Sequence, residues 1–230
     1  MADDFSEYWY FERFDVLNAL TENEKQKIIG MSCLTEIPKK SIVYSTKDQA
    51  NRLYFLKKGK VKVSKYSDDG KEMIISILSA GDVFGEYSIL SDTNDNHQEV
   101  VEVMEDVLTC SLSIPDVKDL LRNNIEFSKS ITALIGFKYK KMQSRLESLF
   151  FKSTPERIKG FIKEMADDYG KKILNSDEII IKLNLKHEDI AKLTGTTRQT
   201  VTSVMNQLDK AGVISYDRTR ILVKDYKSLS

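Results

Sequence analysis

Residues 187–214 have the sequence HEDIAKLTGTTRQTVTSVMNQLDKAGVI and decide the fold of the C-terminal part of this 230-residue chain. Ile190 and Leu193 give a first short helix its apolar side. A second helix is predicted after Thr194-Gly195-Thr196, because its apolar residues recur at spacings of three and four. These are Val201, Val204 and Leu208. The pattern favours a helix-turn-helix, a unit that lays its second helix in the DNA major groove. An ordinary two-helix core fragment is the alternative.

The second helix is predicted over residues 197–211. Thr196 and Gln199 fit a T-x-x-Q capping box at its start, and Gly212 supplies a stop. Its face opposite the apolar residues is polar, and a hairpin with two arginines follows it. The side chains that we expect to contact DNA are Thr196, Thr197, Arg198, Gln199, Thr200, Thr202, Ser203, Asn206, His187, Arg218 and Arg220.

Charge is unevenly distributed although the whole chain is neutral, with 35 Lys and Arg against 35 Asp and Glu. Residues 182–230 hold nine basic and five acidic side chains, a local excess of four positive charges. Because attraction to phosphates is local, this supports nucleic-acid binding by the C-terminal part. Cys33 and Cys110 have no CxxC spacing, and no apolar signal or membrane-spanning run is present. We therefore expect a cytoplasmic protein with no membrane partner.

Short β-prone runs follow one another from Ile37 to about Leu112. They are IVYS, RLYFLKKGKVKVSKY, EMIISILSAGDVFGEY and VVEVMEDVLTCSLSI, and Asp69-Gly70 is a hairpin signal between two of them. Strands at this spacing predict an antiparallel β-barrel or jelly roll. With a preceding helix over Glu22–Leu34, we expect a first domain at residues 1–114.

Helices are predicted from Pro115 onward, with a long one from about Ile125 to Phe150. Its apolar stripe either packs on the barrel or forms a seam between two subunits, as the near-heptad spacing suggests. Lys138 and three other basic residues lie on its other face. The residues expected to dimerise the chain are Ile131, Leu134, Ile135, Met142, Leu146 and Leu149.

The C-terminal domain is expected at residues 153–230, after a helical linker at 115–152. It begins with a helix capped by Thr154, with Pro155 at its first helical position. The strand DEIIIKLNL and the helix-turn-helix follow, and ISYDRTRILVKDY predicts a winged hairpin. The fold class is therefore α+β, with an antiparallel β-barrel, a long helix and a winged helix-turn-helix.

The stretch GDVFGEYSIL, residues 81–90, places two glycines and a carboxylate in a tight turn after a strand. Glycine lets backbone N–H groups approach an anion closely, and a carboxylate beside it accepts from a sugar hydroxyl. A barrel corner that needs glycine is the alternative.

Five motifs in order resemble the family of the cyclic-AMP receptor protein and the fumarate-nitrate regulator (Crp/Fnr). They are RLYFLKKGKVKV, DGKEMIISIL, GDVFGE, PERIKGFI and HEDIAKLTGTTRQTVTSVMNQL, and the resemblance covers about residues 14–226. It implies a bacterial transcription regulator that binds a two-fold symmetric double-stranded DNA site as a homodimer. It also implies contact with RNA polymerase and a signal sensed in the barrel.

In this resemblance Arg198 matches an arginine that reads guanine, while Gln199 and Ser203 replace a common glutamate and a common arginine. The sensor residues are matched less evenly. His97 and Gln98 stand where the family has an Arg-Ser pair for the cyclic phosphate, and Met142 and Gln143 where it contacts adenine. The effector-pocket residues implied are Gly85, Glu86, Tyr87, Ser88, His97, Gln98, Met142 and Gln143.

No arginine lies between Arg52 and Arg122, so a buried cyclic phosphate has no matching guanidinium. We expect no tight cyclic-AMP binding, and either an effector of other chemistry or DNA binding without one. Two cysteines and two histidines do not suit an iron–sulfur cluster, and no metal site is predicted. The alternative function is a cyclic-nucleotide-binding module that acts through protein contacts. No catalytic constellation is present, so an enzyme is not expected.

Overall fold

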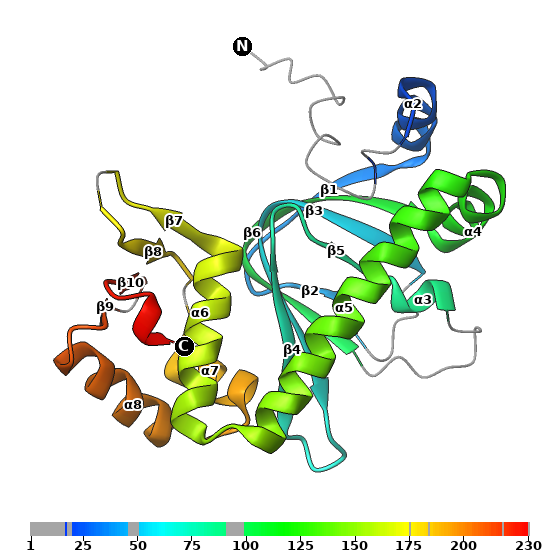
Figure 1. Ribbon diagram of the computed structural model, residues 1–230. Coiled ribbons are helices and arrows are strands. Elements are labelled where there is room, and N and C mark those ends of the chain that lie inside the picture. The colour runs from blue at the N-terminus through cyan, green and yellow to red at the C-terminus, as the bar shows by residue number, and fades with distance from the viewer. Residues whose placement is uncertain are drawn as a thin grey trace. The chain divides into compact units, whose positions relative to one another are not determined.

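A computed structural model describes residues 17, 20–45, 51–90, 99–174, 176–183, 185–217 and 219–229 of the chain. Its contacts divide the chain into two compact units, residues 1–140 and 141–230 (Figure 1). The first unit holds a curved antiparallel sheet with helices. The second unit holds a small sheet with three complete α-helices among its described residues.

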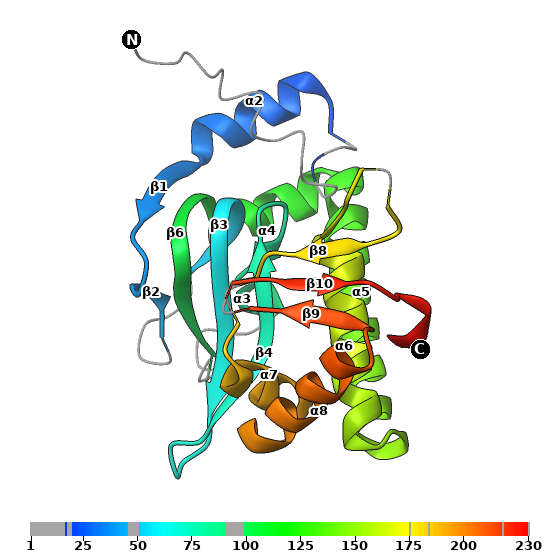
Figure 2. The ribbon, with the colours of Figure 1, turned by 90° about the vertical axis from the view of Figure 1, so that its left-hand side faces the viewer.

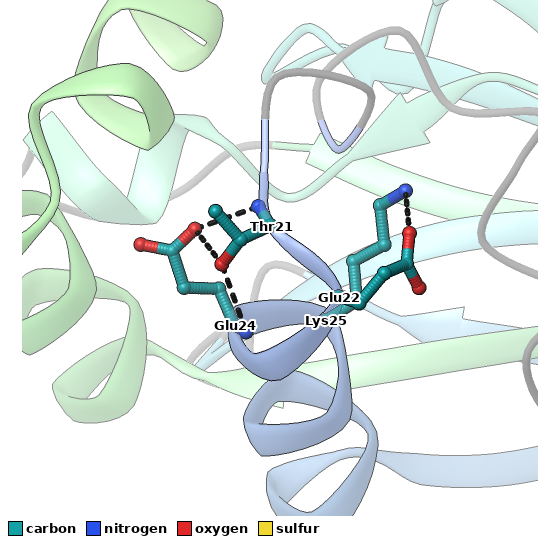
Figure 3. Close-up of polar contacts among 4 residues, drawn as sticks. All are labelled: Thr21, Glu22, Glu24 and Lys25. Atoms are coloured by element: carbon teal, nitrogen blue, oxygen red, sulfur yellow. Dashed lines mark hydrogen bonds and ion pairs between the residues drawn. The ribbon is translucent and has the colours of Figure 1, made fainter.

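Helix α2 (Glu22–Met31) precedes the sheet of the first unit in the chain. Its N-cap is Thr21, whose backbone N–H donates to the Glu24 carboxylate at 2.7 Å while its hydroxyl accepts from the Glu24 N–H (Figure 3). This capping box satisfies two free backbone donors at the helix start. The helix predicted to reach Leu34 ends earlier, because the chain turns extended at Ser32 and pairs with the sheet.

Six strands form the sheet of the first unit, in the order β1-β6-β3-β4, with β2 beside β6 and β5 beside β3. They are β1 (Cys33–Ile37), β2 (Ile42–Tyr44), β3 (Arg52–Tyr66), β4 (Glu72–Ser79), β5 (Val83–Phe84) and β6 (Glu99–Ser113). The predicted jelly roll is confirmed. The prediction of a closed barrel is wrong, however, because among the described strands β1 pairs only with β6, β4 pairs only with β3, and the two do not pair with each other.

Strands β3 and β6 form the longest pairing of the sheet. It runs from Arg52↔Ser113 to Lys65↔Glu99 and contains three register shifts. The hairpin predicted at Asp69-Gly70 joins β3 to β4, and Gly70 has a φ of +78°. Apolar side chains of alternate residues point inward, as the period of two predicts. One buried cluster contains Leu56, Val61, Val63, Leu78, Phe84, Val101 and Val103.

Two helices follow the sheet, α4 (Ile114–Asn123) and α5 (Ile125–Phe151). Ser113 caps α4 through the N–H of Asp116. Phe127 of α5 is fully buried in a second apolar cluster that also holds Leu53, Phe55, Leu112 and Val117. The first turns of α5 are therefore part of the core of the first unit.

The second unit is a winged helix fold (Figure 2). Its sheet has the order β7-β8-β10-β9, and the hairpin of its last two strands confirms the predicted wing. The elements are α6 (Thr154–Tyr169), β7 (Gly170–Lys172), β8 (Ile179–Ile181), α7 (His187–Thr194), α8 (Arg198–Lys210), β9 (Ile214–Tyr216), β10 (Ile221–Val223) and η2 (Lys227–Leu229).

Helix α6 has the predicted bounds, but its N-cap lies one residue before the predicted one. Ser153, and not Thr154, is its N-cap, because the Ser153 hydroxyl and backbone N–H both bond to the Glu156 carboxylate, at 2.6 and 2.7 Å. Pro155 then lies within the first turn, where no backbone donor is needed.

Candidate nucleic-acid interface and effector turn

The turn between α7 and α8 is fixed by a glycine and an arginine. Gly195 ends α7 in the left-handed conformation, with φ +64° and ψ +47°. Arg157 of α6 donates to the carbonyl oxygen of Thr194 at 3.0 Å and to that of Gly195 at 3.2 Å. A third bond runs to the carbonyl oxygen of Lys152 at 3.1 Å. Arg157 was not predicted in this role, because its acceptors are backbone groups that only the fold brings together.

Thr197 caps helix α8. Its hydroxyl accepts from the Thr200 N–H at 3.2 Å, and its backbone is extended, with φ −98° and ψ 153°. The predicted capping box of Thr196 and Gln199 is wrong by one residue, since the Thr196 N–H instead bonds back to α7 at Ala191. Gln199 is thereby left exposed on the helix surface.

Helix α8 divides into a buried and an exposed side. Val201, Val204, Met205 and Leu208 are buried, as the spacing predicts. Thr197, Arg198, Gln199, Ser203 and Asn206 are exposed, whereas Thr196, Thr200 and Thr202 are half-buried. A surface hollow at the start of the helix is lined by Thr197, Arg198, Gln199 and Thr202. The helix has no acid in its first turn, so its N-terminus presents an arginine and unopposed backbone dipoles.

A polar network ties the exposed face of α8 to its surroundings. The Thr202 hydroxyl donates to the carbonyl oxygen of Arg198 at 2.9 Å, so His187 Nδ1, 2.8 Å away, is the donor in its bond to that hydroxyl. Tyr216 of β9 lies beside the His187 ring, with centroids 5.5 Å apart, and donates from its hydroxyl to Asn206 at 2.8 Å. Tyr216 was not predicted, because nothing in the sequence places this strand residue beside α8.

The charge state of His187 follows from its place in this network. Partial burial, and then the guanidinium of Arg198, hold the pKa of His187 below its ordinary value. The imidazole is therefore neutral near pH 7, with its proton on Nδ1.

The wing turn is organised by Asp217. Its carboxylate accepts from the backbone N–H groups of Thr219 at 2.8 Å and Arg220 at 3.1 Å, and from the Arg220 guanidinium at 2.8 Å. These bonds hold the pKa of Asp217 well below its usual range. Arg220 thus lies exposed but partly neutralised at the wing tip, and Arg218 lies outside the described residues.

The predicted effector turn requires glycine at residue 85. Gly85 has a φ of +85°, and a Cβ there would lie 2.4 Å from the carbonyl oxygen of Arg52. The short helix α3 (Tyr87–Leu90) begins directly after Glu86. The hydroxyl of Ser88 is buried and has no hydrogen-bond partner within the described part of the chain.

The carboxylate of Glu86 forms an ion pair with a lysine of α5. Lys138 Nζ lies 2.8 Å from the Glu86 carboxylate and donates to the carbonyl oxygen of Val83 at 2.7 Å. Lys138, which the sequence places on the face opposite the apolar stripe, therefore contacts the turn that contains Gly85 and Glu86. The stripe pattern of a helix does not reveal a carboxylate carried by a distant turn.

Aromatic and acidic side chains lie around this pair. Tyr44, Tyr54 and Phe84 stack, with centroids of the last two 4.8 Å apart and their planes at 4°. Burial, and then the carboxylate of Glu86, raise the pKa of the Glu99 carboxyl. Tyr87 is exposed, as are Met142 and Gln143, which belong to the second unit. His97 and Gln98 lie outside the described residues.

The predicted dimerisation stripe separates into two parts. Ile131 is only 2% exposed, and Leu134 and Ile135 pack against the same cluster, so the first half of the stripe covers the core of the first unit. A seam role for Ile131 is wrong for this reason. In the second half, apolar side chains are exposed at spacings of three and four. They are Tyr139 at 63%, Met142 at 63%, Leu146 at 55% and Leu149 at 45%. Tyr139 was missed.

Comparisons with known proteins agree with this geometry. The sequence pattern of the cyclic nucleotide-binding domain matches residues 34–124, and that of the Crp-like helix-turn-helix domain matches residues 156–230. The chain is 30% identical over 183 residues to a global nitrogen regulator of Nostoc sp., covering 80% of this chain and 81% of that protein. The chain belongs to the Crp/Fnr family.

Two further proteins are similar to this chain over most of its length. A CRP-like cAMP-activated global transcriptional regulator of Mycobacterium tuberculosis is 24% identical over 195 residues, 85% of each chain. Among solved structures, a variant of CooA from Carboxydothermus hydrogenoformans has a TM-score of 0.73 and 27% identity, covering 94% of this chain and 92% of that one. The protein is thus a Crp/Fnr DNA-binding transcription regulator and not an enzyme.

No three His, Cys, Asp or Glu side chains of the described residues are grouped so that they could hold a metal ion. No helix in the same residues has the length and apolar content needed to cross a membrane.

Proposed function

We propose that this Crp/Fnr regulator binds a palindromic double-stranded DNA site as a homodimer, with the N-terminal half of α8 in the major groove. The observation that carries this proposal is the capped, acid-free start of α8, where Arg198 and Gln199 are fully on the surface. Domains at residues 1–114 and 153–230, joined by 115–152, are part of the same proposal.

Arg198 is the principal base-reading residue in this account. A bidentate arginine contact to guanine discriminates by about 1–3 kcal/mol. Gln199 offers an amide that suits adenine, and Ser203 offers a single hydroxyl on the same face. Asn206 accepts a bond from Tyr216, so its free amide N–H groups remain available to a base or phosphate acceptor.

Contacts to the phosphate backbone of the DNA are proposed to hold α8 in register with the bases. Thr196, Thr197, Thr200 and Thr202 lie at the positive end of α8, where hydroxyl and N–H groups suit a phosphate. Arg218 and Arg220 of the wing, together with His187, complete the proposed interface. Because the Arg220 guanidinium already bonds Asp217, its contribution is smaller than that of an unpaired arginine.

The homodimer is proposed to form along the exposed half of the α5 stripe, through Tyr139, Met142, Leu146 and Leu149, with the half-buried Leu134 and Ile135 at the N-terminal end of this seam. The 3–4 spacing places these side chains on one seam, the pattern of a two-stranded coiled coil. A second copy would bury the apolar surface that one copy leaves exposed.

The effector is proposed not to be cyclic AMP bound in the usual way. Glu86, the expected ribose contact, is paired with Lys138, and Glu99 adds a second carboxylate to its neighbourhood. No arginine between Arg52 and Arg122 offsets a cyclic phosphate. An effector that bonds Glu86 would release Lys138, and thereby loosen α5 from the turn that contains Gly85, Tyr87 and Ser88. His97, Gln98, Met142 and Gln143 complete the proposed pocket.

The remaining partners follow from the family. RNA polymerase is the proposed protein partner, and the cytoplasm the proposed compartment. Selection from a random DNA library, followed by footprinting, tests the main proposal. A recovered palindrome protected by the wild type supports it. Binding that depends only on salt and ignores sequence would instead favour a module acting through protein contacts.

A further inference from the structure

A polar groove in the second unit lies between the last turns of α5 and the facing side of α6. Its volume is about 260 Å³. The lining includes Lys141, Arg145, Lys152 and Arg157, the hydroxyl-bearing Ser144 and Ser148, and one carboxylate, Glu164. The groove walls therefore carry a net charge of +3, which is concentrated on one side of α5 and at the start of α6.

The four cations are held in different ways. Lys141 lies 2.5 Å from the carboxylate of Asp168 and 3.7 Å from that of Glu164, so its charge is largely matched. Arg157 donates its N–H groups to the carbonyl oxygens of Thr194 and Gly195 in the α7–α8 turn. Lys152 is exposed, and within the described part of the chain its ammonium makes no ion pair or hydrogen bond.

Arg145 is a half-buried cation of the groove. Burial lowers the pKa of its guanidinium, and the carboxylate of Glu164 only partly opposes this effect. A desolvated guanidinium gains more from an added anion than a hydrated one does. Lys152 Nζ lies 3.9 Å from where a side chain on Gly160 would begin, so this ammonium reaches the side of α6 that lines the groove.

We propose that this groove binds the phosphate group of a small phosphorylated metabolite, with Arg145 and Lys152 as charge partners and Ser144 and Ser148 as hydroxyl donors. A phosphate suits this set better than a monocarboxylate, because it carries more charge and more acceptor oxygens. The site is separate from the Gly85–Glu86 turn. A bound phosphate would bridge α5 and α6 across Ser153. It would lie beside Lys152, whose carbonyl oxygen accepts from the same Arg157 guanidinium that also bonds the α7–α8 turn.

The direct test is calorimetric titration of the full-length protein with pyrophosphate, without DNA and at constant ionic strength. We expect one site per chain, weakened about tenfold or more in Lys152→Gln, the loss of one charged hydrogen bond. Lys140→Gln removes an exposed charge of α5 that does not line the groove, and this variant should bind pyrophosphate as the wild type does. Both side chains are exposed, so both variants should keep the wild-type thermal transition.

A second arm separates a free phosphate from a DNA phosphate. Lys152→Gln is titrated with DNA as well as with pyrophosphate. Loss of pyrophosphate binding in this variant, with wild-type binding in Lys140→Gln, supports the proposal. No heat of binding, equal binding by both variants, or a loss of DNA affinity with unchanged pyrophosphate binding would each overturn it.

Discussion

The ammonium group of Lys138 lies 2.8 Å from the carboxylate of Glu86 and also bonds the carbonyl oxygen of Val83. One side chain of α5 thus holds both the carboxylate and the backbone of the turn that is proposed to contact the effector. Because the exposed fractions of the two side chains are 30% and 22%, water screens the pair only in part.

Breaking this pair is expected to destabilise the first unit. Lys138→Met should lower the free energy of unfolding by about 1–2 kcal/mol, since Glu86 loses its partner. In a double-mutant cycle with Glu86→Gln, the coupling energy should exceed about 0.5 kcal/mol. Urea denaturation of the four proteins measures it. Additive effects would mean that the two side chains do not interact in solution.

The glycine requirement of the effector turn can be tested against a matched turn. Gly85→Ala should cost about 3 kcal/mol or more, because a Cβ meets the Arg52 carbonyl oxygen and the φ is positive. Gly70→Ala has a similar φ, +78°, but no atom within 4 Å, and should cost about 1–2 kcal/mol. Thermal denaturation compares the two. Equal losses would remove the steric part of the argument.

Several elements could be predicted because their signals are local. The alternation in Arg52–Tyr66 and the stripe of α5 predicted both elements closely. Strand β1 was missed because its side chains are mostly exposed, and an edge strand is defined by its partner β6. Lys138, Arg157 and Tyr216 acquire their roles through contacts between segments that are distant in sequence. No local pattern reports such contacts.

The depressed pKa of His187 makes the stability of the second unit depend on pH. The unfolded chain binds more protons than the folded one below the ordinary value of 6.5, so stability should fall as pH falls through that value. His187→Gln should lose less stability than the wild type between pH 7.5 and pH 5.5. Thermal melts at both pH values provide the comparison. Parallel losses in the two proteins would assign the pH dependence to other groups.

The α5 seam predicts a substitution that yields a monomer. Leu146→Asp places a charge on a seam that buries this residue twice in a homodimer, and it should weaken dimerisation about a hundredfold or more. Leu146→Met keeps an apolar side chain of similar volume and should remain a dimer. Sedimentation equilibrium distinguishes the two. A monomeric wild type, or a dimeric Leu146→Asp, would contradict the seam.

The central claim is that the start of α8 reads DNA bases through Arg198. The measurement that tests it most directly is the ratio of affinities for the selected palindrome and for a scrambled duplex, at one salt concentration. Arg198→Ala should reduce this ratio about tenfold or more, whereas Lys210→Ala at the far end of α8 should leave it unchanged. If Arg198→Ala keeps the wild-type ratio, base reading by this helix start is contradicted.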